Sequence, residues 1–272
     1  MDRFLLINNK DFFDKHNIYT INNEKDIPNI SSILFIGSHT HSIDRLDHIK
    51  KYFNIIQNKP YNYIIIIGKG DGTLQINNIP ENIKYIYATN TDYDHTIIKF
   101  LPMGCDFRSI NSFNKAYINN NRNILCYCNF STNTHPIRTH IYNNIKNKDF
   151  IMFENMGTFL NYSISRDTFF ERLGTSKYTI CPRGNGIDTF RFYDAIYSGS
   201  IPIVVKEHFH NLKIFEDIPI LFLEKEEDYK DLTKDFLEEK YVELSKKIKS
   251  NIENNYENFD FSNFINNIKK LL

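Results

Sequence analysis

The chain has 272 residues, and its 33 lysines and arginines equal its 33 aspartates and glutamates. This length suffices for two modest domains or one large one. A net charge of zero argues against nucleic acid as a main partner, because nucleic-acid binding usually needs a basic excess. No apolar run approaches the roughly 18 residues of a membrane-spanning helix, and the first residues do not read as a signal peptide. Four cysteines, Cys105, Cys126, Cys128 and Cys181, fit reduced buried thiols, so we expect a cytoplasmic protein without a transmembrane segment.

The first half of the chain predicts a small parallel α/β domain over residues 1–106. Strands are expected at 31–37, 63–68, 83–87 and 97–101, with weaker strand character at 4–7, and a helix is expected at 43–56. Strands alternating with helix-length gaps are typical of a parallel sheet with crossover helices. The asparagine-rich residues 107–121 predict a linker.

The second half predicts another α/β domain over residues 122–255. Its strands are expected at 123–128, 150–153, 178–181, 201–205 and 219–223, and its helices at 136–145, 165–173 and between Asp188 and Gly199. The charged residues 224–250 predict two helices, and 256–272 predict a final amphipathic helix.

Residues 176–205 contain the most informative pattern, a strand, a glycine turn, a helix and a second strand. The turn is Pro182-Arg183-Gly184-Asn185-Gly186, whose glycines and asparagine allow positive φ and close backbone approach. Asp188 is expected as the N-cap of the helix and Gly199 as its C′ residue. The turn thus joins the carboxyl end of a strand to the amino end of a helix, where α/β sheets bind ligands and phosphate is attracted.

Charged side chains around this turn suit a nucleotide. Arg183 and Arg191 offer two forks that could hold a diphosphate, and the carboxylate of Asp194 could accept two ribose hydroxyls. The alternative is a tight turn with a surface ion pair between Arg191 and Asp194, worth a few tenths of a kcal/mol. Arg138 follows the loop 129–133 at the end of another strand, and either faces the same phosphates or lies exposed on a capped helix. The combination favours a ligand site.

The same stretch resembles the donor-sugar module of exostosin-type glycosyltransferases, which have the two-domain GT-B architecture. The matching residues are Ser176, Lys177, Tyr178, Pro182, Gly184, Gly186, Asp188, Thr189, Arg191, Asp194, Ala195, Gly199, Ile201 and Pro202. The resemblance implies an α/β fold with two Rossmann-like domains and a nucleotide-sugar site. Asp194 stands where that family usually has glutamate, which is one methylene longer. By analogy with GT-B proteins, 256–272 is expected to join the first domain.

The resemblance implies a hexosyltransferase or related enzyme of glycan biosynthesis. It would move a sugar from a UDP- or GDP-linked donor to a hydroxyl of a glycan or glycoprotein, without a further cofactor. The residues expected to bind the donor are Arg138, Arg183, Gly184, Asn185, Gly186, Asp188, Thr189, Arg191 and Asp194. Arg183, Arg191 and the amides of 188–190 would stabilise the departing diphosphate, which is electrostatic catalysis.

A base that deprotonates the acceptor is expected only if the anomeric centre inverts. His39 and His41 follow the strand at 31–37 and have a suitable pKa, with Asp44, Asp92, Asp94 and His95 as rivals. Each alone is better explained as a solvated loop residue, so the prediction concerns the region more than any one residue. The turn Gly68-Lys69-Gly70-Asp71-Gly72 lacks the order of a phosphate-binding P-loop and is expected to end a strand.

Pairs of metal-ligand residues do not predict a metal site. His39 and His41, Cys126 and Cys128, and His208 and His210 are each separated by one residue, unlike the spacing of zinc fingers. Alternation along a strand places Cys126 and Cys128 on one face, which fits a core. No DxD-like element stands out as an anchor for a metal ion on the diphosphate, so metal-independent transfer is expected, with the arginines neutralising the diphosphate.

Two other functions fit the same residues. One is a nucleotide-sugar-binding protein that has lost turnover, which would bind the donor without transfer. The other is an interaction module on a GT-B-like fold, whose small first domain serves as a docking surface and which would bind no nucleotide. The donor base, the sugar and the acceptor do not follow from the sequence.

Overall fold

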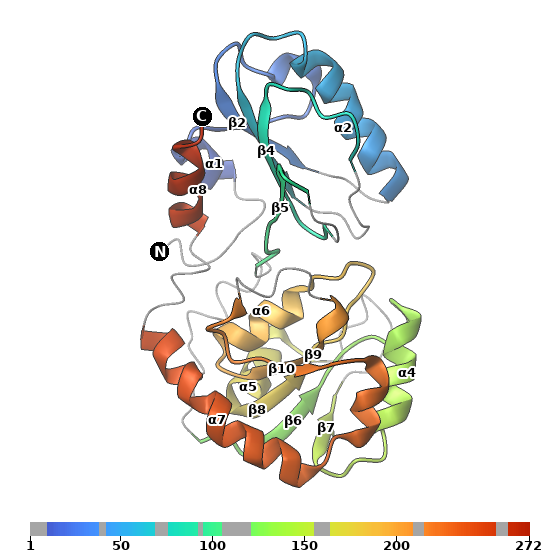
Figure 1. The fold of residues 1–272 in the computed structure, drawn as a ribbon. Coiled ribbons are helices and arrows are strands. Elements are labelled where there is room, and N and C mark those ends of the chain that lie inside the picture. Colours follow the sequence, from blue (N-terminus) through green and yellow to red (C-terminus); the bar gives the residue numbers. More distant parts are fainter. Residues whose placement is uncertain are drawn as a thin grey trace. The chain divides into compact units, whose positions relative to one another are not determined.

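The computed structural model describes residues 10–37, 42–68, 76–91, 95–104, 121–154, 164–208, 215–253 and 261–272. The chain divides into two compact units: unit 1 comprises Met1–Phe107 and Glu257–Leu272, and unit 2 comprises Arg108–Tyr256. Each unit holds a five-stranded sheet whose strand pairs are all parallel (Figure 1). The predicted α/β class with two Rossmann-like domains is therefore confirmed. The GT-B architecture consists of two such domains. Most of the predicted linker at 107–121 lies outside the described residues.

The sheet of unit 1 follows the order of the sequence. Its strands are β1 (Ile18–Thr20), β2 (Ser32–Gly37), β3 (Tyr63–Gly68), β4 (Ile83–Ala88) and β5 (Ile98–Phe100), arranged β1-β2-β3-β4-β5. Every residue of β3 is buried, as expected of a central parallel strand covered on both faces. The four stronger strand predictions are confirmed, β1 was missed, and the weak strand predicted at 4–7 lies outside the described residues.

Helices cover both faces of this sheet. Helix α2 (Ser42–Ile56) packs Ile49, Tyr52 and Phe53 into a core with alternate residues of the strands. On the other face lie α1 (Lys10–Lys15) and α8 (Phe261–Lys269), which are neighbours in Figure 1. Their rings contact the sheet, since Phe13 lies 4.4 Å from Phe35 and Phe264 lies 4.9 Å from Tyr87, measured between ring centroids. The 3-10 helix η1 (Glu24–Asp26) connects β1 to β2.

The sheet of unit 2 contains a reversal of strand order. Its strands are β6 (Ile124–Cys128), β7 (Ile151–Phe153), β8 (Ser176–Ile180), β9 (Ile201–Val205) and β10 (Leu221–Leu223), arranged β10-β9-β8-β6-β7. The chain leaves β6 to form β7 on one side and returns to form β8 on the other. The carboxyl ends of β6 and β8 therefore flank the topological switch point, where doubly wound sheets bind ligands. All five predicted strands are confirmed.

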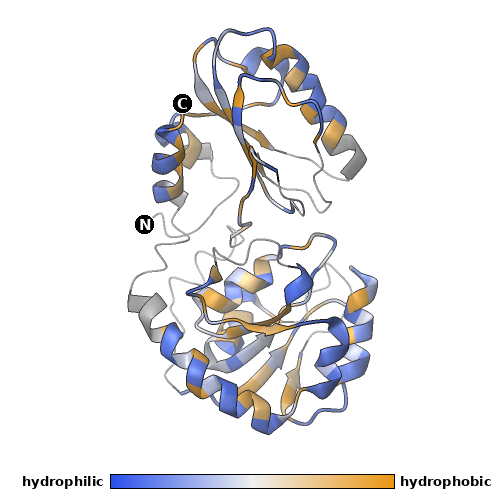
Figure 2. Ribbon diagram, viewed as in Figure 1, coloured by the Kyte–Doolittle hydropathy of each residue, from blue (hydrophilic) through white to orange (hydrophobic). Residues whose placement is uncertain are grey.

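Helices also cover both faces of the second sheet. Helices α4 (Pro136–Ile145) and α7 (Lys234–Glu253) share one core cluster with Cys126 and Cys128. Helices α5 (Arg166–Thr175) and α6 (Phe190–Tyr197) lie on the other face, where Phe169 is 6.4 Å from Tyr127 between ring centroids. In Figure 2, α4 and α7 carry both hydrophilic and hydrophobic residues, as expected of helices with one face on a core.

Short 3-10 helices follow the last two strands of unit 2: η3 (Lys206–His208) follows β9, and η5 (Glu226–Asp231) follows β10. The two helices predicted within 224–250 are η5 and α7. None of the helices in the described ranges is long and apolar enough to span a membrane.

Candidate functional site

The predicted ligand turn lies at the switch point of unit 2. Asn129 directly follows β6, and Pro182 to Gly186 follow β8. Because β6 and β8 are adjacent parallel strands, these two loops emerge side by side at one edge of the sheet. Helix α6 then begins at Phe190, which brings its amino end to the same edge.

In the glycine turn, glycine allows a neighbouring side chain to approach the backbone closely, and the backbone is not left-handed. The amide of Gly184 donates to the carbonyl of Gly186 at 3.0 Å. Among the described glycines positive φ occurs at Gly104 and Gly199, so the positive φ that the residues of 184–186 allow is not used there. A Cβ at Gly184 would lie 3.1 Å from Nη2 of Arg138, tighter than most real contacts, so the missing side chain makes room for that guanidinium.

Arg138 ties the two loops of the switch point together. Its Nε donates to the carbonyl of Arg183 at 2.7 Å, Nη1 to that of Ser131 at 3.2 Å, and Nη2 to that of Pro182 at 3.3 Å. The residue is buried, so the alternative of an exposed arginine is wrong. Burial and the neighbouring Arg191 lower the pKa of Arg138, but a guanidinium stays charged at neutral pH. Its described hydrogen bonds are to backbone carbonyls, and a contact with a nucleotide sugar stays a prediction.

Helix α6 begins one residue later than expected. Its N-cap is Thr189, whose side chain makes no capping hydrogen bond. Asp188, the predicted N-cap, is buried and accepts a hydrogen bond from the Tyr193 hydroxyl at 2.8 Å. The first turn of α6 therefore presents backbone N–H groups that the Thr189 hydroxyl does not satisfy, a favourable environment for an anion.

Arg191 and Asn129 place polar N–H groups between the two loops. Nη2 of Arg191 donates to Oδ1 of Asn129 at 3.2 Å, and the guanidinium carbon lies 6.0 Å from the centroid of Phe169. The Nε of Arg191 and the Nδ2 of Asn129 are buried and have no hydrogen-bond partner among the described residues. Buried N–H groups without acceptors are costly, so this pair favours binding of an acceptor oxygen. The sequence marked the loop 129–133, which Asn129 begins, as one that could face the phosphates, but Asn129 itself was not among the residues predicted to bind the donor.

The remaining predicted residues on α6 and the turn are also at this edge. Arg183 folds back over its own turn and donates from Nε to the carbonyl of Gly184 at 3.4 Å and from Nη2 to that of Asn185 at 3.3 Å. Asp194 is 4% exposed, so the alternative of a surface ion pair with Arg191 is wrong. No described contact tests Asp194 as a ribose ligand, and this role stays a prediction.

The predicted acceptor-side residues are mostly beyond the described chain. His39, His41, Asp92 and Asp94 lie outside the described residues, as does 69–72 of the second glycine turn. The side chain of Asp44 is likewise not described. His95 is described, and its Nδ1 accepts from the amide of Ile97 at 3.3 Å, which ties this ring to its own loop.

The cysteines of unit 2 belong to the interior, as predicted. Cys126, Cys128 and Cys181 are free and buried, and Cys126 and Cys128 both contribute to the core cluster beneath α4. Burial raises the pKa of all three thiols, that of Cys181 to about 12. They are therefore core residues whose thiols are protonated at neutral pH.

Comparison with known proteins relates this site to one family. The family model described as "Exostosin GT47 domain" matches residues 74–211, which include Asn129, Arg138 and the whole of 182–194. A protein of Arabidopsis thaliana named "Probable glycosyltransferase" is 30% identical over 109 residues, which are 38% of this chain and 22% of that relative. The chain thus spans less than a quarter of the length of this curated relative.

Two solved structures are distantly similar. One is a "Crystal Structure of alpha1,3-Fucosyltransferase with GDP", with 14% identity and a TM-score of 0.46 over 81% of this chain and 70% of that one. The other is the pneumococcal O-GlcNAc transferase GtfA in complex with UDP and GlcNAc, with 11% identity and a TM-score of 0.39 over 96% of this chain and 58% of that one.

Proposed function

Because this chain belongs to the Exostosin GT47 domain family, we propose that it is a glycosyltransferase, which transfers a sugar from a nucleotide-sugar donor to a hydroxyl group of a glycan or glycoprotein. The matched residues contain the switch point of unit 2, so the family assignment and the candidate site concern the same part of the chain.

The observation that best supports the proposal is the set of N–H groups at this switch point. The buried Nε of Arg191 and Nδ2 of Asn129 lack acceptors among the described residues, and the first turn of α6 has no side-chain cap. Phosphate oxygens satisfy such groups and benefit from the helix dipole and the guanidinium charge. A nucleoside diphosphate is therefore the ligand that this edge fits best.

The chemistry follows from where charge develops. When the bond between the anomeric carbon and the diphosphate oxygen breaks, negative charge grows on the departing nucleotide. Arg183, Arg191 and the amides of 188–190 would stabilise that charge in a site formed in advance, which lowers the barrier. Arg138 would act through the backbone, because it holds the carbonyls of Pro182 and Arg183 in place.

Other features of the reaction extend the proposal. Asp194 lies on the same helix as Arg191 and is proposed to accept ribose hydroxyls. We propose UDP or GDP as the nucleotide, and transfer without a metal ion on the diphosphate, since the arginines supply the positive charge. His39 or His41 is proposed as the base if the reaction inverts the anomeric centre. A cytoplasmic location stays a prediction.

The test is nucleotide binding followed by turnover. Thermal shift and calorimetry with UDP, GDP, CDP and their common sugars should identify one nucleotide that stabilises the protein, by about 2.7 kcal/mol at 100 times its Kd. Arg191→Ala should abolish this stabilisation. Lys146→Ala, which removes an exposed cation at the end of α4, is the matched control and should keep it.

The outcomes separate the three functions. Selective binding with release of nucleotide from the sugar donor supports the glycosyltransferase. Selective binding without any transfer or hydrolysis would indicate a nucleotide-sugar-binding protein without turnover. No binding of any nucleotide by the folded protein would contradict both and leave an interaction module.

A further inference from the structure

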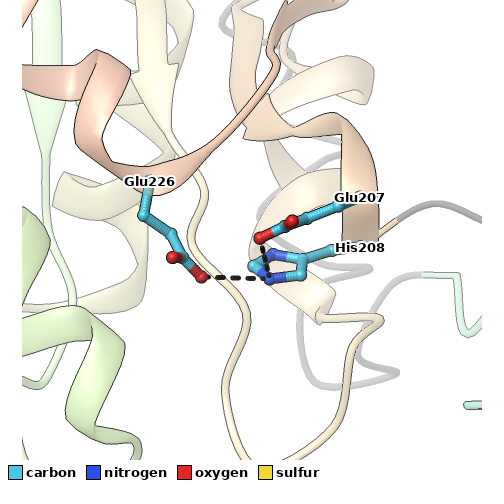
Figure 3. Close-up of side chains that lie close together, drawn as sticks. All are labelled: Glu207, His208 and Glu226. Atoms are coloured by element: carbon cyan, nitrogen blue, oxygen red, sulfur yellow. Dashed lines mark ion pairs between the residues drawn. The ribbon is translucent and has the colours of Figure 1, made fainter.

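A second polar cluster lies at the carboxyl edge of the same sheet, after β9 and β10. Glu207 and His208 belong to η3, which follows β9, and Glu226 is the first residue of η5, which follows β10. Since β9 and β10 are parallel neighbours, the segments that follow them emerge together. Figure 3 shows both carboxylates directed at the same nitrogen of the His208 ring.

The distances within this cluster match those among the ligands of one metal ion. Nε2 of His208 lies 3.4 Å from Oε1 of Glu226 and 3.8 Å from Oε1 of Glu207. One ligand atom of each residue lies within 4.8 Å of the others. Tetrahedral ligands at about 2.0–2.2 Å from Zn²⁺ are themselves about 3.3–3.6 Å apart, so shifts of a few tenths of an ångström to about an ångström would bring the three atoms around one ion.

Burial distinguishes these side chains from an ordinary exposed acidic patch. The side chains of His208 and Glu226 are 12% and 26% exposed, whereas that of Glu207 is 55% exposed. Two of the three groups are thus largely withdrawn from water, and solvent reaches the cluster from the side of Glu207. A water molecule could therefore complete a fourth position.

Electrostatics at this edge also favour a cation. Oε1 of Glu207 and Oε1 of Glu226 lie 3.8 and 3.4 Å from the same imidazole nitrogen, so the two carboxylates are close neighbours. Two carboxylates therefore repel each other in a partly dehydrated place. A divalent ion between them would offset that repulsion more strongly than a proton on His208 could.

We propose that Glu207, His208 and Glu226 bind a divalent transition-metal ion, for which Zn²⁺ is the best match. One imidazole nitrogen and two carboxylate oxygens are a suitable ligand set for zinc, with water as the fourth ligand. Such an ion would join the segments that follow β9 and β10. The proposal does not depend on the transfer chemistry proposed above, and it stands whether or not the chain binds a nucleotide.

The test is a zinc titration of full-length protein that has been stripped with a chelator and dialysed. Calorimetry and elemental analysis should find a zinc ion whose binding weakens at least tenfold in both His208→Asn and Glu226→Gln, about the size of effect seen when metal-site residues are lost. Co²⁺ in place of Zn²⁺ should give the visible absorption of a four-coordinate site in the parent protein and not in these variants. Circular dichroism would establish that each variant is folded.

Glu224→Gln is the matched control, because Glu224 follows β10 directly but is 73% exposed and pairs with Lys206. It removes one nearby carboxylate and should leave zinc affinity unchanged. Absence of zinc binding in the parent protein, or zinc binding that survives both His208→Asn and Glu226→Gln, would overturn the proposal and leave a histidine–carboxylate ion pair.

Discussion

Gly199 ends α6 at a position where a side chain would strain the backbone and would also clash with a neighbouring side chain. Its φ is +72°, and the amides of Gly199 and Ser200 donate to the carbonyls of Ile196 and Ala195, both at 2.9 Å. This is the Schellman pattern, in which glycine is favoured because left-handed backbone is strained for other residues. The prediction of Gly199 as the C′ residue is confirmed.

The space around Gly199 is also filled. A Cβ there would clash with Nη2 of Arg122. We therefore expect Gly199→Ala to lower the free energy of unfolding by about 1–3 kcal/mol, through backbone strain and displacement of that guanidinium. Urea denaturation measures this.

Gly37→Ala is the control for this substitution. A Cβ at Gly37 would meet Cε1 of Phe35 at an ordinary 3.5 Å, and Gly37 has no positive φ. Its effect should stay below about 1 kcal/mol in either direction. Equal losses in the two variants would show that neither the strain nor the crowding at Gly199 matters.

The Arg122 guanidinium that crowds Gly199 also forms hydrogen bonds that connect the ends of two helices. It donates from Nη1 to the carbonyls of Leu173 and Ser176 at 3.3 and 2.8 Å, and from Nη2 to that of Ser198 at 2.9 Å. These carbonyls lie at the ends of α5 and α6, where a cation is favoured by the helix dipole. These three partners lie 51 to 76 residues away in the sequence, so no local pattern could identify this role.

A double-mutant cycle should detect this coupling. Arg122→Ala alone should cost about 1.5–3 kcal/mol, the range for hydrogen bonds to a charged group. In that background Gly199→Ala should cost less than in the parent, because no guanidinium remains to be displaced, with an interaction free energy of about 0.5–3 kcal/mol. Urea denaturation of the four proteins gives this value, and strict additivity would show that the two residues act independently.

At the level of elements, the sequence predicted every described strand except β1, and it missed α1. The isoleucine-rich β3 and the strand β9 have runs of buried residues that indicate a parallel sheet. The strand β1 and the helix α1 have three and six residues, too few to show a period, and they lie in a polar stretch of the sequence. The sequence favoured Asp188 as the N-cap, because aspartate is a good N-cap residue. In the structure its carboxylate accepts a hydrogen bond from the Tyr193 hydroxyl, and Thr189 is the N-cap.

The candidate site likewise has features that the sequence could predict and features that it could not. Its turn and the arginines around it are local, so Arg183, Arg191 and Gly184 could be selected from spacing alone. Contacts between elements could not be selected: the bond from Arg191 to Asn129 spans 62 residues, and those from Arg138 to the turn span 44 and 45. The partnership of His208 with Glu226 is of the same kind, because it depends on β9 and β10 being neighbours.

The cysteines on β6 and after β8 make unit 2 sensitive to alkaline pH. Unfolded thiols titrate near pH 8.5, whereas burial raises the pKa of Cys181 to about 12 and raises those of Cys126 and Cys128 as well. Between these values the folded chain keeps protons that the unfolded chain has lost. Stability from this source is therefore complete below about pH 8.5 and falls as pH rises above it.

Urea denaturation at pH 7 and pH 9.5 should show this loss, at about 1.4 kcal/mol per pH unit for each thiol at most. Cys181→Ala should lose less stability over the same interval than the parent does, by about 1 kcal/mol, since one thiol no longer titrates. The same pH dependence in both proteins would contradict the assignment of Cys181 as a buried, protonated thiol.

At the scale of the molecule, unit 1 is built from two separate parts of the chain. Its last helix, α8, contributes Ile265 and Ile268 to the interior, and Ser262 lies 3.4 Å from Nε2 of His16 near α1. Unit 2 has its own core and needs no residue of α8 for it. A substitution that destabilises α8 should therefore lower the stability of unit 1 and leave that of unit 2 unchanged.

Ile265→Ala tests this division. Removing a fully buried isoleucine should cost unit 1 about 2–5 kcal/mol, because a cavity remains. In hydrogen exchange, amides of β2 and β3 should lose protection, while those of β6 and β8 should keep theirs. Asn266→Ala, an exposed neighbour on the same helix, is the control and should change neither sheet. Loss of protection in both sheets would show that the two units unfold together.

The interrupted course of unit 1 has a consequence for how the protein is made. A ribosome delivers residues 108–256, which contain every strand of unit 2, before it delivers α8. During translation the second unit can therefore close its core while the first still exposes the face of its sheet that Phe264 and Ile265 will cover. Unit 1, whose synthesis begins before that of unit 2, is therefore completed after it, because part of its apolar surface stays exposed until α8 has been made.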